Sequence, residues 1–327
     1  MAQYCSLLSC DQAGHWLPQH VASDHPDKYQ ESTQLMNASP VRLELSTQLG
    51  YDIGAGGCDF IFNVQAARTA RQTVVSESLR LSQDVPVTDY VDPATQSRFL
   101  RVHAEPGDFT LRYTAVLDLN HHRAPADDLP ACGPLDLPGD VLPFLSPSRY
   151  CQSDRLMAMA GREFGYVPAS YRQAQAICDW VSQHVTFQSN SSTGATSAID
   201  TLVERVGVCR DFAHLMIALC RASGLPARMA SGIDYGADPI LGPQDFHAYV
   251  EVFVGKRWYL FDPSRTAIPM GFVRFGTGRD ATDIAFATMY GAISSQQPVI
   301  SIAAVPNAHG ELIEPQRVAD ALSTDGV

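Results

Sequence analysis

The sequence lacks any run of apolar residues long enough to cross a bilayer. Its first twenty residues, MAQYCSLLSCDQAGHWLPQH, also lack the basic segment followed by an apolar core that defines a secretory signal. A membrane-spanning helix needs about 20 predominantly apolar residues. These absences predict a cytoplasmic location with no membrane partner.

Basic residues are scarce. The chain has 23 Lys and Arg against 35 Asp and Glu, which gives a formal net charge of −12. Nucleic acids and anionic membranes attract basic surfaces, so we expect neither as a partner. The charge says nothing about the fold or the oligomeric state.

Closely paired cysteines are also missing. The eight cysteines are scattered along the chain, which is typical of reduced thiols rather than of a disulfide framework. His15, His20 and His25 recur at a spacing of five, which matches no familiar zinc pattern. We therefore expect no metal and no cofactor.

The composition along the chain divides it into five segments. Residues 1–40 are polar and aperiodic and predict a disordered or extended tail. Residues 41–122 alternate between apolar and polar positions, which predicts a small amino-terminal β-sandwich domain. Residues 123–148 contain six prolines and predict an extended linker. In residues 149–305 helical periods precede strand periods, so we expect an α+β domain with an antiparallel sheet. Residues 306–327 are polar and predict a flexible tail.

The motif GVCRDFAHLMIALC spans residues 207–220 and places two cysteines on one predicted helix. Cys220 lies on the apolar stripe and is expected to pack in the core. Cys209 lies in the first turn, where free amide groups and the helix dipole favour a thiolate. Gly207 is expected to leave space for a substrate carbonyl. His214 is about 140° around the helix from Cys209 and faces elsewhere.

A second motif, FHAYVEVFVGKRWYLFDPS, predicts two strands joined by a two-residue turn at Gly255 and Lys256. With that turn, His247 and Asp262 lie on one face as diagonal neighbours. A turn one residue longer or shorter would place them on opposite faces. The order Cys209, His247, Asp262, on a helix and then two strands, is the order of a papain-like triad.

Three motifs together resemble the transglutaminase-like superfamily: GVCRDFAHLMIALCRASGLPAR, HAYVEVFVGKRWYLFDPS and GRDATDIAF. Residues 41–119, with the later PSRYCQSDRL, resemble the amino-terminal domain of its bacterial branch. The resemblance implies a papain-like or transglutaminase-like catalytic domain. It implies Cys209 as nucleophile, His247 as general base and acid, and Asp262 as the group that orients His247. No calcium-binding loop is recognisable, so calcium dependence is not expected.

Other residues admit two interpretations each. Trp258 shares the face of His247 and either flanks the site, as in cross-linking members of the superfamily, or packs in the core. Arg279 and Asp280 either form a loop over the site that helps to bind substrate or lie in a solvated turn. Asp211 follows the nucleophile and is expected to cap the helix or support the site.

The sequence thus predicts thiol-dependent acyl transfer or hydrolysis at a carboxamide or peptide bond, through a thioester on Cys209. The enzyme would be a cysteine peptidase or amidase, or a protein-glutamine acyltransferase, and we favour hydrolysis of a peptide or isopeptide amide. The alternative is a catalytically silent scaffold that binds peptides. A zinc hydrolase would need ligand spacing that the sequence lacks.

Overall fold

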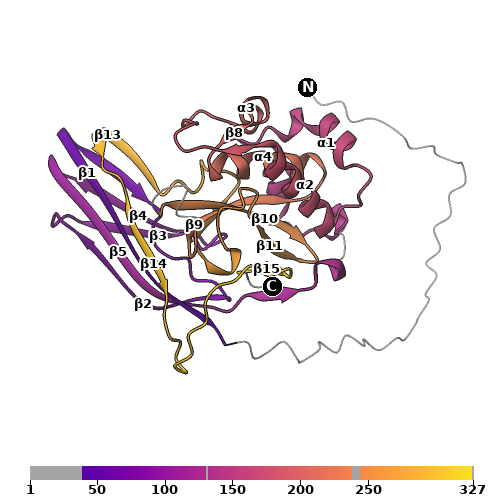
Figure 1. Ribbon diagram of the computed structural model, residues 1–327. Helices are drawn as coiled ribbons and strands as arrows, with labels where there is room; N and C mark the ends of the chain where they lie inside the picture. The colour runs from indigo at the N-terminus through magenta and orange to yellow at the C-terminus, as the bar shows by residue number, and fades with distance from the viewer. Residues whose placement is uncertain (1–38, 130–131, 238–243, 326–327) are drawn as a thin grey trace, which may run out of the picture. The chain divides into compact units, whose positions relative to one another are not determined.

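The computed structural model describes residues 39–129, 132–237 and 244–325 (Figure 1). The tail predicted at 1–40 therefore lies outside the described residues, except for its last two positions. Within the described part of the chain, no helix is both long enough and apolar enough to cross a membrane. The elements include a seven-stranded sheet and a four-stranded sheet.

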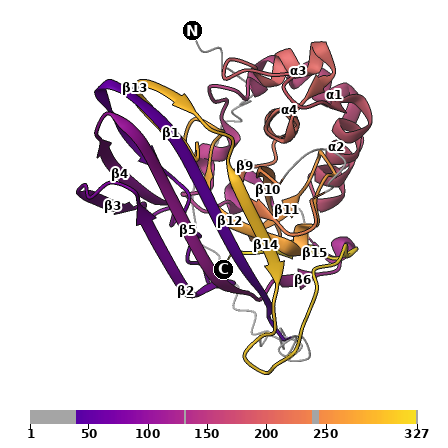
Figure 2. The same cartoon turned by 60° about the vertical axis from the view of Figure 1, so that its left-hand side comes forward.

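The seven-stranded sheet is built around the long strand β1, and its other members pair directly or indirectly with that strand (Figure 2). Its strands are β1 (Val41–Phe62), β2 (Gln72–Leu81), β3 (Val87–Val91), β4 (Arg98–Ala104), β5 (Gly107–Leu119), β13 (Ala287–Ser295) and β14 (Val299–Ala304). Val41, Leu43 and Leu45 are buried on one face, as the alternation predicts. The expected β-rich amino-terminal region is confirmed.

Strand β1 changes its neighbours halfway along its length. Residues up to Ile53 pair with β5, and residues from Cys58 pair with β4. The register with β13 shifts between these two residues. Gly57 lies there with φ +69, and a Cβ on it would come 3.1 Å from the carbonyl oxygen of Ala104. Glycine therefore permits the irregularity that bends the strand.

The carboxyl-terminal strands β13 and β14 complete this sheet by pairing with β1. The sequence places residues 299–305 among the strands of the predicted catalytic domain, and the structure differs. Alternation identifies a half-buried strand but not the sheet to which it belongs, because pairing depends on where the chain returns.

The second sheet has the order β11-β10-β9-β12, and every pair in it is antiparallel. Its strands are β9 (Ala227–Asp234), β10 (Phe246–Val254), β11 (Arg257–Phe261) and β12 (Phe272–Gly278). The helices before it are α1 (Met157–Phe164), α2 (Tyr171–His184), α3 (Ala198–Glu204) and α4 (Cys209–Ala222). The two-residue strands β7 (Thr186–Phe187) and β8 (Val206–Gly207) pair in parallel between them. This arrangement confirms the α+β catalytic fold.

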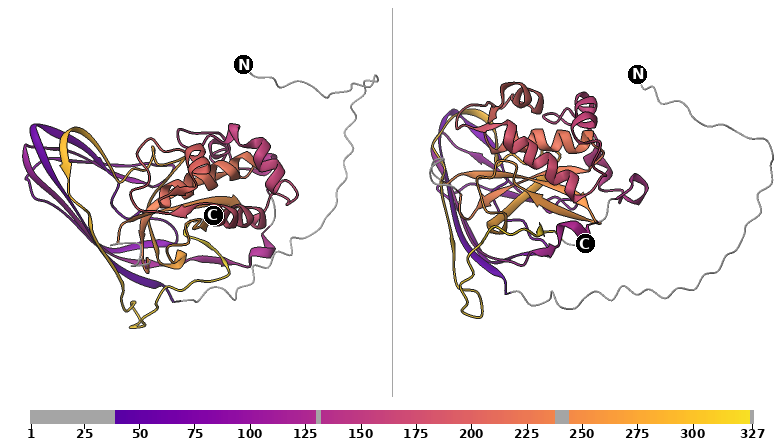
Figure 3. Two further views of the ribbon diagram at one scale, coloured as in Figure 1. Left: turned by 45° about the horizontal axis from the view of Figure 1, so that its top comes forward. Right: turned by 45° about the vertical axis from the view of Figure 1, so that its right-hand side comes forward.

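Helix α4 lies at the centre of the helical layer and covers one face of the second sheet (Figure 3). Its apolar residues are buried on nearly all sides, and Cys220 is among the fully buried ones. Full burial of a Leu, Ile, Met or Phe side chain contributes about 1.5–3 kcal/mol to folding. The helix therefore fixes the position of its own first turn relative to β9 and β10.

The segments predicted as linker and tail contain short elements. The proline-rich segment holds 3-10 helices at Ala126–Asp128, Pro134–Asp136 and Leu142–Leu145, in agreement with the expected lack of α-helix. It begins with β6 (His122–Ala124), which pairs with β15 (Ala321–Ser323). All three residues of β15 are buried, so the structure differs here from the flexible tail that the sequence predicts.

The two sheets share one apolar core at the β9–β12 side. Ile233, Val273 and Phe275 of the second sheet pack in the same cluster as Phe60 and Phe62 of β1. Buried hydrogen bonds reinforce this contact, because the Gln72 side chain donates to the Arg274 carbonyl at 2.8 Å and accepts from the Arg274 amide at 2.9 Å. These contacts hold the first sheet beside one end of the second sheet, the end at which β9 finishes and β10 begins.

Candidate active site

Cys209 is the first residue of α4 and lines a cleft of about 660 Å³. Its side chain is half-buried, and its sulfur lies 4.0 Å from the carbonyl oxygen of Phe246, at the start of β10. The helix begins here because Asp211 caps it: its carboxylate accepts from the Val208 amide at 2.8 Å. The expected capping role of Asp211 is confirmed, and the cap directs the first turn of α4 towards the cleft.

Gly207 packs tightly against the Asp211 side chain. A Cβ at this position would lie 2.7 Å from the Cβ of Asp211. Such contacts are shorter than van der Waals packing allows. The glycine is therefore required by the buried cap, and space for a substrate carbonyl is not needed to explain it.

His247 lies on β10 between β9 and β11 and also lines the cleft. The hairpin has the predicted register, with Phe253 opposite Trp258. Gly255 and Lys256 have φ values of +55 and +66, as a two-residue primed turn requires. This register brings Nε2 of His247 to 3.4 Å from Oδ1 of Asp262, which follows β11.

Asp262 is buried and held by its own loop. Its Oδ1 accepts hydrogen bonds from the Ser264 amide at 3.1 Å and the Ser264 hydroxyl at 2.6 Å. Its Oδ2 accepts from the Ala267 amide at 3.2 Å. Burial raises the pKa of Asp262, but the bond from His247 and those from its own loop lower it below its ordinary value. Asp262 therefore carries a negative charge towards His247.

Asp234, at the end of β9, is a site residue that the sequence analysis did not identify. Its Oδ2 lies 3.7 Å from Nδ1 of His247, and it is completely buried. Phe246 pairs with Ile233 across the two strands, so Asp234 and His247 are diagonal neighbours. The only sequence signal for Asp234 was an acidic residue in SGIDYG. This signal could not place Asp234 beside His247, because eleven residues separate β9 from β10 and no short turn sets their register.

The charge state of His247 follows from these neighbours. Burial lowers the pKa of His247, but the Asp234 carboxylate, the Cys209 sulfur and the hydrogen bond to Asp262 raise it well above its ordinary value. Burial raises the pKa of Asp234 to about 7, although His247 counteracts this effect. The site therefore favours a protonated His247 imidazole beside the Cys209 sulfur.

The cleft lining also contains apolar residues, which form an apolar wall. The Phe246 and Phe286 rings stack at 4.3 Å with an interplanar angle of 6°, and Phe286 is 39% exposed. Met229 and Ile284 lie on the same lining. The wall gives the cleft a surface that an apolar side chain can cover.

Trp258 shares the sheet face of His247, as predicted, but it does not line the cleft. It lies near the hairpin turn, where it packs against Phe253, Val141 and Phe144 and is 7% exposed. The Arg228 guanidinium stacks over its ring at 4.1 Å. Of the two interpretations, core packing describes its position. Two side chains on one face of a sheet can lie several residues apart, so sharing the face of His247 does not bring Trp258 to the cleft.

Arg279 and Asp280 flank the loop that lines the cleft without lining it themselves. Arg279 is paired with Asp283 at 2.9 Å on the exposed side. Asp280 is buried and accepts hydrogen bonds from the amides of Tyr150 at 2.9 Å and Thr282 at 2.9 Å. Both side chains therefore hold the loop in shape, and its later residues, such as Ile284, reach the cleft.

His214 faces away from the cleft, as predicted from the helical period. It is fully buried, stacks on Tyr150 at 4.8 Å, and accepts a hydrogen bond from the Ala281 amide at 3.2 Å. Burial lowers its pKa to about 3, so the imidazole is neutral. His214 thus also anchors the loop beside the cleft.

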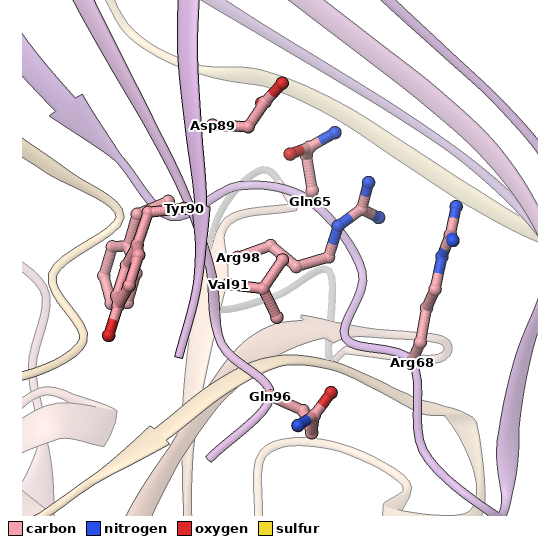
Figure 4. Close-up of a pocket in the computed structure, with 8 residues that line it drawn as sticks. Gln65, Arg68, Asp89, Tyr90, Val91, Gln96 and Arg98 are labelled. Atoms are coloured by element: carbon pink, nitrogen blue, oxygen red, sulfur yellow. The ribbon is translucent and has the colours of Figure 1, made fainter. Parts of the chain in front are cut away.

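A second, smaller pocket of about 280 Å³ lies on the seven-stranded sheet (Figure 4). Arg68 and Arg98 line one side of it, and Tyr90 points away from them (Figure 4). Both guanidinium groups pair with Glu77 at 2.8 Å. Both guanidinium groups are therefore already engaged in ion pairs, which they share through a single carboxylate.

Metal ligands do not converge in the described residues. No group of three His, Cys, Asp or Glu side chains is arranged there to hold a metal ion. Asp234, His247 and Asp262 are close together, but each carboxylate faces a different nitrogen of the same imidazole.

Comparisons with known proteins identify the family of the chain. Residues 159–263 match the model of the transglutaminase-like superfamily, and residues 41–129 match the bacterial transglutaminase N-terminal domain. A crystal structure from Cytophaga hutchinsonii, of a protein proposed to be a cysteine protease, is 37% identical with a TM-score of 0.79. The match covers 88% of this chain and 98% of the Cytophaga hutchinsonii chain. The chain belongs to the transglutaminase-like superfamily.

Curated relatives come from mycobacteria and are uncharacterised. One from Mycobacterium leprae is 27% identical over 146 residues, which is 43% of this chain and 52% of the relative. One from Mycobacterium tuberculosis is 34% identical over 110 residues, which is 30% of this chain and 35% of the relative. The chain therefore spans about half or less of the length of these relatives.

Proposed function

We propose that the protein is a thiol-dependent hydrolase of peptide or isopeptide amides that acts through Cys209, His247 and Asp262. The observation that carries the proposal is the shared cleft: a half-buried Cys209 at a helix start faces the same space as His247, and His247 is 3.4 Å from Asp262. The superfamily and the Cytophaga hutchinsonii relative support thiol chemistry.

The first half-reaction forms a thioester. Cys209 attacks the amide carbonyl carbon as a thiolate, its proton having passed to His247, and the carbonyl π electrons move to oxygen. When that oxygen re-forms its double bond, the C–N bond breaks and His247 gives its proton to the leaving amine nitrogen. Asp262 keeps the imidazole oriented through Nε2, so Nδ1 is left for this proton transfer. The amides of Cys209 and Arg210, in the first turn of α4, would stabilise the oxyanion.

The second half-reaction releases the acyl group. A water molecule gives a proton to His247 and adds to the thioester carbon, and the C–S bond breaks to regenerate Cys209. A primary amine in place of water would make the reaction a transamidation. A labelled primary amine and ¹⁸O-water separate the outcomes: hydrolysis places ¹⁸O in the product carboxylate, and transfer places the label in an amide.

The test of the nucleophile is to trap the acyl-enzyme. The full chain is incubated with a peptide library, quenched in acid and digested, and the Cys209 peptide is examined by mass spectrometry for a hydroxylamine-sensitive adduct. Cys209→Ala should abolish the adduct and turnover. Cys132→Ala is the matched control, because Cys132 is also half-buried but does not line the cleft. Full activity in a strong chelator is expected.

A peptide-binding scaffold predicts a different result. It would form no adduct, its Cys209→Ala variant would bind peptides as tightly as the wild type, and iodoacetamide would label Cys209 with the pH profile of an ordinary thiol. Turnover that survives Cys209→Ala would equally overturn the proposed mechanism.

A further inference from the structure

His247 has acidic residues on both neighbouring strands. Asp262 follows β11 and faces Nε2 at 3.4 Å, and Asp234 ends β9 and faces Nδ1 at 3.7 Å. Papain-like triads need one such partner, which orients the imidazole. In the proposed mechanism, the second carboxylate faces the nitrogen that exchanges protons with Cys209 and the substrate.

The Asp234 carboxylate is not committed to the fold by hydrogen bonds. It is fully buried, and among the described residues neither of its oxygens has a hydrogen-bond partner. The Tyr249 hydroxyl lowers the pKa of Asp234 but makes no hydrogen bond of ordinary length and angle with its carboxylate. A buried carboxylate without such bonds costs stability, so a role in the site explains its presence better than a role in folding.

We propose that Asp234 is a positioning residue that holds His247 in its protonated form, with Nδ1 directed towards Cys209, at neutral and alkaline pH. This inference rests on the proposed function, because a protonated His247 is what the leaving amine requires. Asp234 acts through His247 and does not touch the reacting amide.

The other charged groups around His247 do not replace Asp234. Cys209 approaches from α4, Asp262 from the end of β11, and Tyr249 lies beside it on β10 at a ring distance of 4.9 Å. Asp245, before β10, also lines the cleft, but it accepts a hydrogen bond from the Phe246 amide at 2.7 Å. Only Asp234 among the described carboxylates is recorded within 4.0 Å of Nδ1.

The pKa of Asp234 suits this role. Burial raises it to about 7, so the carboxylate becomes negative in the range where an ordinary histidine, with a pKa of about 6.5, loses its proton. Its negative charge therefore opposes the loss of the His247 proton in the same pH range. The expected consequence is an activity that extends to higher pH than one carboxylate partner would allow.

Direct titration of His247 tests the proposal. Histidine Cε1 is labelled with ¹³C in the full chain, the His247 signal is assigned by its loss in His247→Gln, and its shift is followed against pH. In Asp234→Asn the midpoint should fall by about one pH unit or more, because an opposite charge within about 4–6 Å typically shifts a pKa by that amount. Asp245→Asn is the matched control, since it removes one negative charge from the same cleft, and its shift should be less than half as large.

Two outcomes would overturn the proposal: an unchanged midpoint in Asp234→Asn, or an equal shift in Asp245→Asn. If Asp234→Asn does not fold by circular dichroism, Asp234→Ser provides the same titration with a smaller side chain. The comparison is repeated in a Cys209→Ala background, where the shift should persist. If Asp234→Asn shows the shift but the chain with Cys209 intact forms no acyl adduct, the proposed function alone is rejected. If that chain forms the adduct but Asp234→Asn shows no shift, the role of Asp234 alone is rejected.

Discussion

Strand β10 carries two buried charge clusters, four residues apart, that are built in opposite ways. At Glu251, two carboxylate oxygens accept hydrogen bonds from Arg228 at 2.6 Å and from Arg274 at 3.0 Å. At His247, the carboxylates lie at 3.4 Å and 3.7 Å, and the Asp234 carboxylate has no hydrogen bond among the described residues. The first cluster is tightly bonded and the second is loose.

The difference distinguishes charged groups that stabilise the fold from charged groups that are available for proton exchange. The Glu251 cluster balances two guanidiniums against two carboxylates, since Asp325 pairs with both arginines. The His247 cluster sets one imidazole against two carboxylates. An excess of negative charge keeps a proton on the imidazole, and long contacts leave it free to exchange that proton. The tight cluster fixes the sheet, and the loose one is available for chemistry.

The largest expected effect comes from breaking the loose cluster. Asp262→Asn keeps the shape but presents an amide to Nε2, so the wrong tautomer of His247 is favoured. Turnover should fall on the order of 10³–10⁴-fold, with a melting temperature close to that of the wild type. Steady-state kinetics and differential scanning calorimetry check both parts.

Ser264→Ala is the control for Asp262→Asn. It removes one hydrogen bond at 2.6 Å from Asp262 and leaves the charge, so it should lower turnover by less than about tenfold. Full activity in Asp262→Asn would show that His247 is oriented by another group.

Breaking the tight cluster should have the opposite signature. Glu251→Gln leaves Arg228 and Arg274 with a neutral partner, and loss of one member of a buried ion pair costs about 3–5 kcal/mol. Urea unfolding should show this loss in the free energy of unfolding, with kcat per folded molecule unchanged. A loss of kcat with unchanged stability would place Glu251 in the chemistry and remove the distinction between the clusters.

The site could be predicted from the sequence to the extent that short-range rules fix it. The two-residue turn at Gly255 sets the register of the hairpin, and that register places His247 beside Asp262. The helix start at Cys209 follows from its local sequence in the same way. Asp234 could not be predicted, because a long connection separates its strand from β10 and leaves the register to tertiary packing.

The fold shows the same limit. Alternation in residues 299–304 predicts a strand, but its pairing with β1 depends on the return of the chain across the molecule. Likewise, the polar composition after residue 305 does not reveal that Asp325 reaches Arg228 and Arg274. Such long-range charge pairs leave no periodic signal in a single sequence.

Acid and base should affect the two clusters in opposite directions. Burial raises the pKa of Asp325, but its two arginines lower it to about 2, below the unfolded value of about 3.9. Its stabilisation is therefore present above about pH 4 and is lost as the pH falls towards 2, by about 2 kcal/mol. Asp234 has a raised pKa of about 7, so its ionisation destabilises the fold as the pH rises from about 4 to above 7.

Unfolding free energies measured from pH 3 to pH 9 test these signs. Asp325→Asn should reduce the loss of stability in acid, and Asp234→Asn should gain stability relative to the wild type as the pH rises, by about 4 kcal/mol. A gain that is equal at pH 5 and pH 9 would mean that Asp234 does not titrate in the folded protein.

The smallest effect is expected from a change in the apolar wall, which contains no residue of either charge cluster. Phe286→Ala removes the partner that stacks on Phe246 at 4.3 Å. Because Phe286 is 39% exposed, its loss should cost the fold little. If substrates cover the wall, KM for peptides with an apolar side chain should rise about five- to tenfold, which corresponds to about 1–1.4 kcal/mol, with kcat and the His247 titration unchanged. Phe286→Leu, which keeps an apolar surface, should recover most of the affinity. A fall in kcat with unchanged KM would instead connect the wall to the position of Cys209 and His247.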